Sequence, residues 1–97
     1  MLSSKQRKFL RSKAHHLKPV VIIGKADIGD YVIKTVDECL KSHELVKVKF
    51  NGHKESKHEV IDSINGQTDS ECIGIIGNVA IIFRQNIEVE DQIYKLD

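Results

Sequence analysis

Hydrophobic residues near the start of the chain recur at the spacing of a helix. Leu10, Ala14 and Leu17 stand at i, i+4 and i+7, which places them on one apolar stripe. Ser3 begins an S-x-x-Q capping box, a frequent start of a helix. The residue before a proline is pushed out of the α region, so the Lys18-Pro19 step stops the pattern. The pattern therefore predicts a first helix from Ser3 or Ser4 to this step.

Four short apolar segments have the composition of strands. Residues 20–23 are β-branched without alternation, which predicts a strand covered on both faces. Residues 45–50 alternate with lysines, so one face of this strand is expected to be wet. Residues 72–76 and 79–84 flank Gly77-Asn78, which suits a two-residue hairpin turn.

Two further helices are predicted between these strands. The second runs from a start capped by Asp27 or Gly29 to about His43. The third is weaker and covers roughly residues 55–65, with Gly66 as the residue just past its end. The last thirteen residues are polar and acidic, and we expect them to extend over the surface.

The order of these elements is α-β-α-β-α-β-β. Crossovers that carry helices, followed by a hairpin, predict an α/β (α+β) fold with a four-stranded mixed sheet packed with helices. The 97 residues are 40% hydrophobic and 30% charged, which is typical of a soluble globular protein. We expect one domain over residues 1–97, with an acidic tail from about residue 85. All three phenylalanines are expected in the core.

Charge is distributed unevenly along the chain. Residues 1–25 contain seven Lys and Arg and no Asp or Glu, whereas the remainder contains eight Lys and Arg and fourteen Asp and Glu. Four of the early cations, Lys5, Arg7, Lys8 and Arg11, fan across the face of the first helix opposite its apolar stripe. A cationic face of this kind attracts polyanions such as nucleic acids.

The segment between the first strand and the second helix has the glycine spacing of a nucleotide-binding loop. Gly24 and Gly29 stand five positions apart, as in G-x-x-x-x-G-K-[ST]. The next positions hold Asp30 and Tyr31, in place of the Lys and Ser/Thr that bind the phosphates and magnesium. This composition argues against nucleotide hydrolysis. A glycine and Lys25 beside a helix N-terminus still favour an anion.

Other chemistry finds little support in the sequence. Cys39 and Cys72 form no C-x-x-C pair and are expected to be buried thiols in a reducing compartment. Neither the adjacent His15 and His16 nor His53 and His58, which stand five positions apart, have metal-ligand spacing. We therefore expect no metal, no cofactor and no catalytic activity. No apolar run approaches the ~20 residues of a membrane span. Thiols that suit a reducing compartment favour a cytoplasmic location.

Three stretches resemble a known family. They read SSKQRKFLRSKAHHLKPVVIIGK, HELVKVKF and IIGNVAIIFR. In order and spacing they are similar to the bacterial YhbY-type proteins, which consist of a single CRM domain, named for chloroplast RNA splicing and ribosome maturation. The resemblance implies an RNA-binding fold like the C-terminal domain of the third bacterial initiation factor. It also implies an association with precursors of the large ribosomal subunit.

The resemblance further implies a loop like the GxxG of KH domains, which clamps the nucleic-acid backbone. The family loop usually reads G-K-x-G, and this chain has Gly24, Lys25, Ala26 and Asp27. The second glycine is thus replaced by an aspartate, whose charge opposes a phosphate. Either Asp27 turns inward to cap the second helix, or the loop binds RNA more weakly than its relatives do.

The sequence thus predicts a monomeric RNA-binding protein of ribosome assembly without enzymatic activity. The candidate RNA-binding residues are Lys5, Arg7, Lys8, Arg11, Lys18, Gly24, Lys25, Ala26, Asp27 and, as the weakest, Arg84. An alternative is a protein-interaction module that docks its basic helix on an acidic partner. A third, a small hydrolase, would require a pocket with converging perturbed groups.

Overall fold

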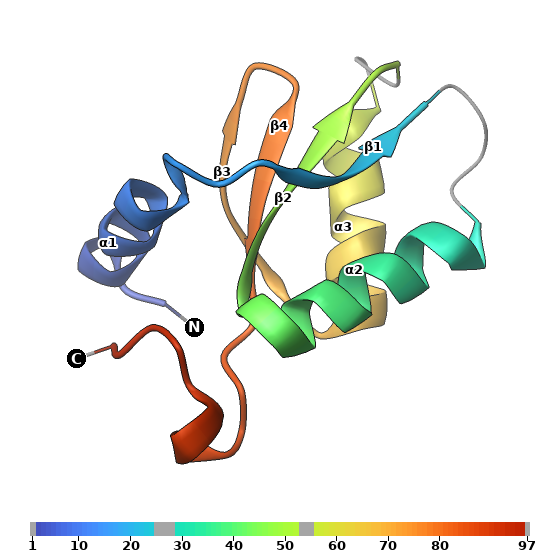
Figure 1. Cartoon of the computed structure of the whole chain (residues 1–97). Coiled ribbons are helices and arrows are strands. Elements are labelled where there is room, and N and C mark those ends of the chain that lie inside the picture. Colours follow the sequence, from blue (N-terminus) through green and yellow to red (C-terminus); the bar gives the residue numbers. More distant parts are fainter. Residues whose placement is uncertain (1, 25–28, 53–55, 97) are drawn as a thin grey trace.

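The computed structural model describes residues 2–24, 29–52 and 56–96, and it confirms the predicted element order and the mixed four-stranded sheet (Figure 1). The elements are α1 (Ser4–Ala14), β1 (Pro19–Ile23), α2 (Asp30–His43), β2 (Leu45–Phe50), α3 (Lys57–Thr68), β3 (Glu71–Ile76), β4 (Val79–Phe83) and the 3-10 turn η1 (Val89–Asp91).

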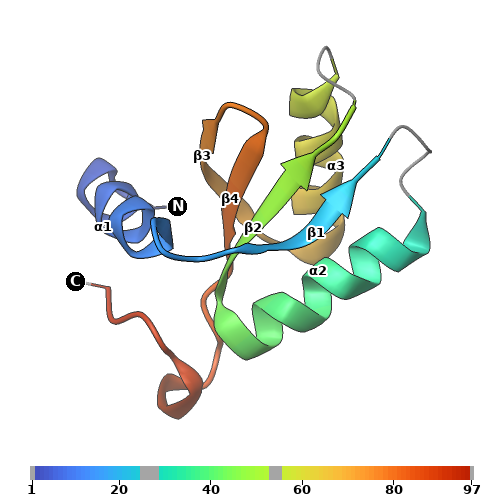
Figure 2. The same ribbon diagram turned by 45° about the horizontal axis from the view of Figure 1, so that its top comes forward.

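The strands lie in the order β1-β2-β4-β3. β1 and β2 are parallel because α2 carries the chain back between them, and β4 runs antiparallel to both β2 and β3. Helices α2 and α3 cover one face of the sheet, and α1 lies against the other (Figures 1 and 2). The sheet therefore separates two hydrophobic cores.

The alternation along each strand divides the apolar residues between these cores. The larger core, beneath α2 and α3, consists of Val21, Ile23, Val36, Leu40, Val46, Val48, Phe50, Ile61, Ile64, Ala80 and Ile82. The smaller core, beneath α1, consists of Leu10, Ala14, Leu45, Ile73, Ile81 and Phe83, with Leu2, Leu17, Tyr94 and Leu96 packed at its edge. In β2 and β4 the two sets of positions alternate, as a period of two requires, whereas a register shift between Cys72 and Gly74 interrupts the alternation in β3.

Helix α1 is shorter than predicted. Its capping box is present, with Ser3 Oγ accepting from the N–H of Gln6 at 3.1 Å, but the helix ends at Ala14. The two histidines that follow are poorer helix formers than the residues before them, and the N–H of Leu17 closes a turn onto the carbonyl of Ala14. Leu17 still packs in the smaller core from outside the helix.

Helix α3 continues past the predicted end. Gly66 lies within the helix, and the left-handed residue after it is Asp69, at φ 55°. The hydroxyl of Thr68 donates to the carbonyl of Ile64 at 2.7 Å, and the N–H of Ser70 closes the end onto Asn65. Aspartate tolerates the left-handed region better than most residues, so glycine is not needed at this position.

Three expectations about burial are wrong. Strand β1 is not covered on both faces, because Ile22 is 64% exposed. Phe9 lies at the surface, 37% exposed, with the ammonium of Lys13 5.4 Å from its ring centroid. Cys39 and Cys72 are free thiols that are only half-buried. Ile22 and Phe9 are thus more exposed than the sequence suggested, and the two thiols lie at the edge of the larger core and not within it.

The tail after β4 does not simply extend over the surface. It forms η1 and then returns to the smaller core, where the Tyr94 ring packs edge-on against Phe83 at 6.4 Å between centroids. Main-chain N–H groups of the tail are bound by the side chain of the fully buried Glu44. The polar composition of the tail concealed these anchors.

Candidate functional site

The exposed surface of α1 carries lysines that no acidic side chain neutralises. Lys5 and Lys8 are exposed, and so is Lys18, which follows the helix. Within residues 2–24, 29–52 and 56–96, the ion pairs involve Arg7, Lys41 and Arg84 but none of these three lysines. Their charges are therefore available to a partner, as predicted for this part of the chain.

The sequence predicted that Arg7 lies free on the outer surface of α1, and this prediction is wrong. Its Nη1 atom is 2.6 Å from Oε2 of Glu71, and its Nη2 atom donates to the carbonyl of Cys72 at 3.0 Å. Arg7 stands one turn before Leu10 and two turns before Ala14, so it lies beside the apolar stripe and not opposite it, where its side chain meets strand β3. Arg7 thus joins α1 to β3.

Arg11 lies over the same strand but keeps more exposure. Its Nη1 atom donates to the carbonyl of Ile73 at 3.2 Å, while the residue as a whole is exposed. A Cβ atom at Gly74 would stand 3.1 Å from Cδ of Arg11. The glycine therefore allows the arginine to cross the strand closely, and part of the guanidinium remains open to solvent.

Arg84 binds groups of α2 and α3 beside the end of β4. Its Nη1 atom is 2.6 Å from Oδ1 of Asp37 and donates to the carbonyl of Thr68 at 2.7 Å, while Nη2 donates to the carbonyl of Asp37. The Arg84 hydrogen bond holds the pKa of Asp37 below its ordinary value. Arg84 thereby joins β4 to α2 and α3, far from the exposed lysines of α1.

The loop after β1 is described only at its two ends. Gly24 is exposed, and no described atom lies within 4 Å of the position that a Cβ atom would take there. Neither crowding in the described residues nor a positive φ requires a glycine at this position. Lys25, Ala26 and Asp27, the other predicted loop residues, lie outside the described residues. Gly29 caps α2 without a side-chain hydrogen bond.

Two lysines of β2 also face the α1 side of the sheet. Val46 and Val48 point into the larger core, so Lys47 and Lys49 point the opposite way. The ammonium of Lys47 donates to the carbonyl of Leu17 at 3.0 Å, and Lys49 is exposed. The alternation of β2 was visible in the sequence, but the candidate residues did not include these lysines.

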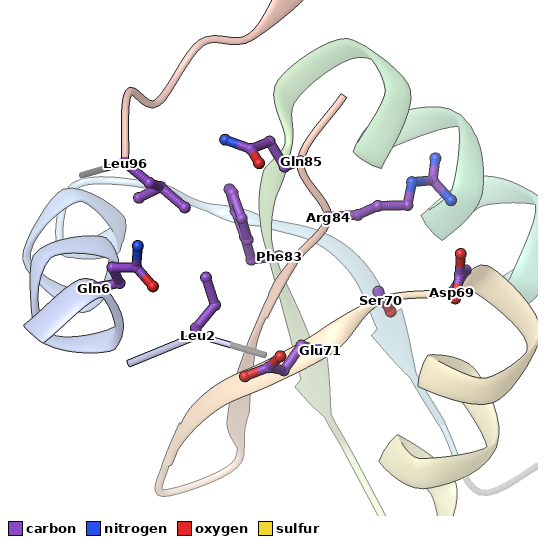
Figure 3. Close-up of a pocket in the computed structure, with 9 residues that line it drawn as sticks. All are labelled: Leu2, Gln6, Asp69, Ser70, Glu71, Phe83, Arg84, Gln85 and Leu96. Carbon is purple, nitrogen blue, oxygen red and sulfur yellow. The ribbon is translucent and has the colours of Figure 1, made fainter. Parts of the chain in front are cut away.

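A depression of about 580 Å³ lies between α1, the tail and the ends of β3 and β4 (Figure 3). Its lining includes the carboxylates of Asp69 and Glu71, and Figure 3 shows Arg84 extending away from α1. Burial raises the pKa of Cys72 and of Tyr94, but neither of these residues lines the depression. Its two carboxylates suit a phosphate poorly, and its one arginine, Arg84, is already bound to Asp37.

The described residues contain neither a group of metal ligands nor a membrane-spanning helix. In the parts of the chain that the structure describes, no three His, Cys, Asp or Glu side chains are grouped so that they could hold a metal ion. No described helix has the length and apolar character to cross a membrane. The exposed cations on the α1 side of the sheet are thus the feature with the clearest chemistry.

Comparisons with known proteins agree on one family. The profile of the CRS1 / YhbY (CRM) domain matches residues 2–84. The chain is 37% identical over 89 residues to a probable RNA-binding protein, YqeI, of Bacillus subtilis, covering 91% of this chain and 93% of that one. It is 36% identical over 93 residues to an RNA-binding protein of Haemophilus influenzae, covering 95% and 94%.

A solved structure has the same fold. The solution structure of SAV1595 from Staphylococcus aureus, described as a putative RNA binding protein, superimposes with a TM-score of 0.79 at 34% sequence identity. The superposition covers 95% of this chain and 97% of that one. The likeness therefore extends over both cores and all four strands.

Proposed function

The chain belongs to the CRS1 / YhbY (CRM) domain family, and we propose that it is an RNA-binding protein that pairs phosphates with the exposed lysines of α1. The observation that carries this proposal is the set of exposed cations Lys5, Lys8 and Lys18 on and just after α1, which form no ion pair within the residues that the structure describes. Relatives over nearly the whole chain are named as RNA-binding proteins, which supports the same conclusion.

The contribution of each candidate residue follows from what it already binds. Lys5, Lys8 and Lys18 supply point charges, and the open part of Arg11 can join them. Arg7 and Arg84 are held by carboxylates and carbonyl groups, so we assign them to positioning the helix and the tail junction. Lys25 and Gly24 remain candidates for a backbone contact at the loop, because no atom of the described residues crowds Gly24.

Lysine substitutions test this assignment. Each phosphate contact on single-stranded RNA contributes about 0.7 to the slope of log K against log salt. We expect Lys8→Ala to reduce the slope by about 0.7 and the double variant Lys5→Ala/Lys8→Ala by about 1.4. Lys41→Ala, which removes one charge from the far end of α2, is the matched control and should leave the slope unchanged. Equal slopes in all four proteins would move the RNA surface elsewhere.

We further propose that the RNA is ribosomal, that the protein acts as a cytoplasmic monomer on precursors of the large subunit, and that it catalyses no reaction. The resemblance to YhbY-type proteins supports this assignment. Crosslinking in cells, followed by sequencing of the bound RNA, should recover mostly large-subunit precursor sequences. An even distribution over messenger RNAs would contradict it. If nuclease treatment leaves the captured partners in a pulldown unchanged, the basic helix docks on a protein instead.

A further inference from the structure

A single row of side chains crosses all four strands. Ile22 pairs with Lys49, Lys49 pairs with Val79, and Val79 pairs with Ile76. Directly paired residues of adjacent strands point to the same face of a sheet, so these four side chains stand in line. The row lies at the end of the sheet that carries the β3–β4 turn (Figures 1 and 2).

The row lies on the α1 side, and α1 does not cover it. The strand neighbours Val48 and Ala80 belong to the larger core, so the row faces away from α2 and α3. Ile22 and Ile76 are 64% and 67% exposed. Arg11 of α1 reaches the strand at Gly74, one row closer to the covered end, and the described helices leave the last row open.

The charged residues that the strands place near this row are lysines. Lys49 stands within it, and Lys47 stands in the next row on the same face. Glu71 is the single acidic residue in the four strands; it lies at the other end of β3 and is paired with Arg7. Within the described residues, the ammonium of Lys49 makes no ion pair. A surface with apolar side chains at both ends and this ammonium between them matches a chain whose phosphates are anionic and whose bases have apolar faces.

We propose that this row binds unpaired nucleotides of single-stranded RNA, with bases lying on Ile22, Val79 and Ile76 and a phosphate on Lys49. This inference rests on the proposed RNA binding and specifies the class of RNA. A duplex keeps its base faces stacked inside the helix and cannot offer them to a flat sheet. Aliphatic side chains contact any base face, so the row selects unpaired RNA and discriminates little between bases.

Two isoleucine substitutions test the row without changing any charge. Ile22→Thr/Ile76→Thr keeps the β-branched shape that suits strands while removing apolar surface. The matched control is Ile87→Thr/Val89→Thr, at residues of the tail that are 94% and 66% exposed. Each protein is titrated with an unstructured oligouridine and with a fully paired RNA duplex of equal length, at two salt concentrations.

The expected result is a loss of affinity for the oligouridine of about fivefold or more in the row variant, with an unchanged salt slope. Duplex binding and the tail variant should match the wild type. Lys49→Ala should weaken oligouridine binding and reduce the slope by about 0.7.

Four other results would overturn the inference in distinguishable ways. Wild-type affinity of the row variant for oligouridine would remove the base-binding row and leave RNA binding by α1 intact. An equal loss for both probes would mean that the row does not recognise unpaired bases. Failure of the wild type to bind either probe would overturn the proposed function as well. A wild-type dimer that the row variant dissociates, by light scattering, would assign the row to a second copy of the chain.

Discussion

The carboxylate of Glu44 accepts a hydrogen bond from the main-chain N–H of Ile93 at 2.7 Å, across forty-nine positions of sequence. The same oxygen accepts from Tyr94 at 2.9 Å, and the second oxygen accepts from Asn86 at 2.6 Å. Glu44 is fully buried and holds a positive φ of 62° at the end of α2. One side chain therefore satisfies three amide groups of the tail from a backbone conformation that few residues adopt.

Replacing Glu44 should destabilise the fold. We expect Glu44→Ala to lower the free energy of unfolding by about 2–4 kcal/mol, because three amides lose their acceptor and a buried side chain is removed. Glu44→Gln should cost less, since one amide oxygen remains. Urea denaturation measures both, with the exposed Glu38→Ala on the same helix as the control. A change below about 0.5 kcal/mol in Glu44→Ala would contradict the role of this carboxylate.

The tail provides a second measurement of the same contact. Ending the chain after Gln85 removes all three amide partners of Glu44 together with Tyr94, which packs on Phe83. If Glu44 acts through the tail, its substitution should have a smaller effect in the shortened chain than in the full one. Equal effects in both chains would show that the carboxylate stabilises α2 independently of the tail.

Arg7 should matter for stability and Lys8 should not, although they are adjacent on α1. We expect Arg7→Ala to lower the free energy of unfolding by about 1–2 kcal/mol, because it removes charge-assisted bonds to β3 and leaves Glu71 without its cation. Lys8→Ala should remain within about 0.5 kcal/mol of the wild type. Thermal or urea unfolding of the two variants decides this. If Arg7→Ala and Lys8→Ala are equally stable, the contacts of Arg7 with β3 do not stabilise the fold, and Arg7 becomes a candidate RNA-binding residue again.

Local patterns in the sequence predicted the elements and the sheet, and long-range contacts account for what they missed. The helical wheel was misread for Arg7, which stands one turn before Leu10 and two turns before Ala14 and so lies beside the apolar stripe, not opposite it. What no local pattern could show is that β3 passes there and supplies a carboxylate. Glu71 is sixty-four positions away from Arg7. The capping box of α1, by contrast, depends only on Ser3 and Gln6, and the sequence predicted it correctly.

The same distinction applies to the candidate site. The exposed lysines of α1 could be recognised because their surroundings are set by one helix. The exposure of Ile22 could not be recognised, because a β-branched residue in a strand is usually buried. Only the structure shows that α1 is too short to cover this end of the sheet. Glu44 was equally hidden, because an acidic residue between a helix and a strand gives no sign of the tail amides that surround it.

The Asp37–Arg84 pair predicts a particular dependence of stability on pH. The pKa of Asp37 is lowered from its ordinary value of 3.8, first by the Arg84 hydrogen bond and then by the nearby positive charges. A carboxyl group with a lowered pKa stabilises the fold above the unfolded value and loses this contribution as pH falls through the folded value. We therefore expect Asp37→Asn to be less stable than the wild type near neutral pH.

The difference in the free energy of unfolding between Asp37→Asn and the wild type should become smaller as the pH falls below about 4. Urea unfolding at a series of pH values measures it, and Glu38→Gln on the same helix is the control for a neutralised carboxylate without an arginine partner. A difference that stays constant down to acid pH would mean that the pair does not titrate in this range.

The last prediction concerns the loop whose middle residues lie outside the described ones. The family resemblance expects glycine where this chain has Asp27, and a carboxylate near an RNA phosphate opposes binding. We expect Asp27→Gly to strengthen binding several-fold at low salt, by about 1 kcal/mol, and less as salt screens the charge. Lys25→Ala should weaken binding. Titration with a ribosomal RNA fragment at two salt concentrations measures both effects.

The control is Asp62→Asn, an exposed position on α3 that changes the net charge by the same amount. Equal gains in Asp27→Gly and Asp62→Asn would reflect net charge alone, and no change in any variant would leave the phosphate to α1 and the sheet.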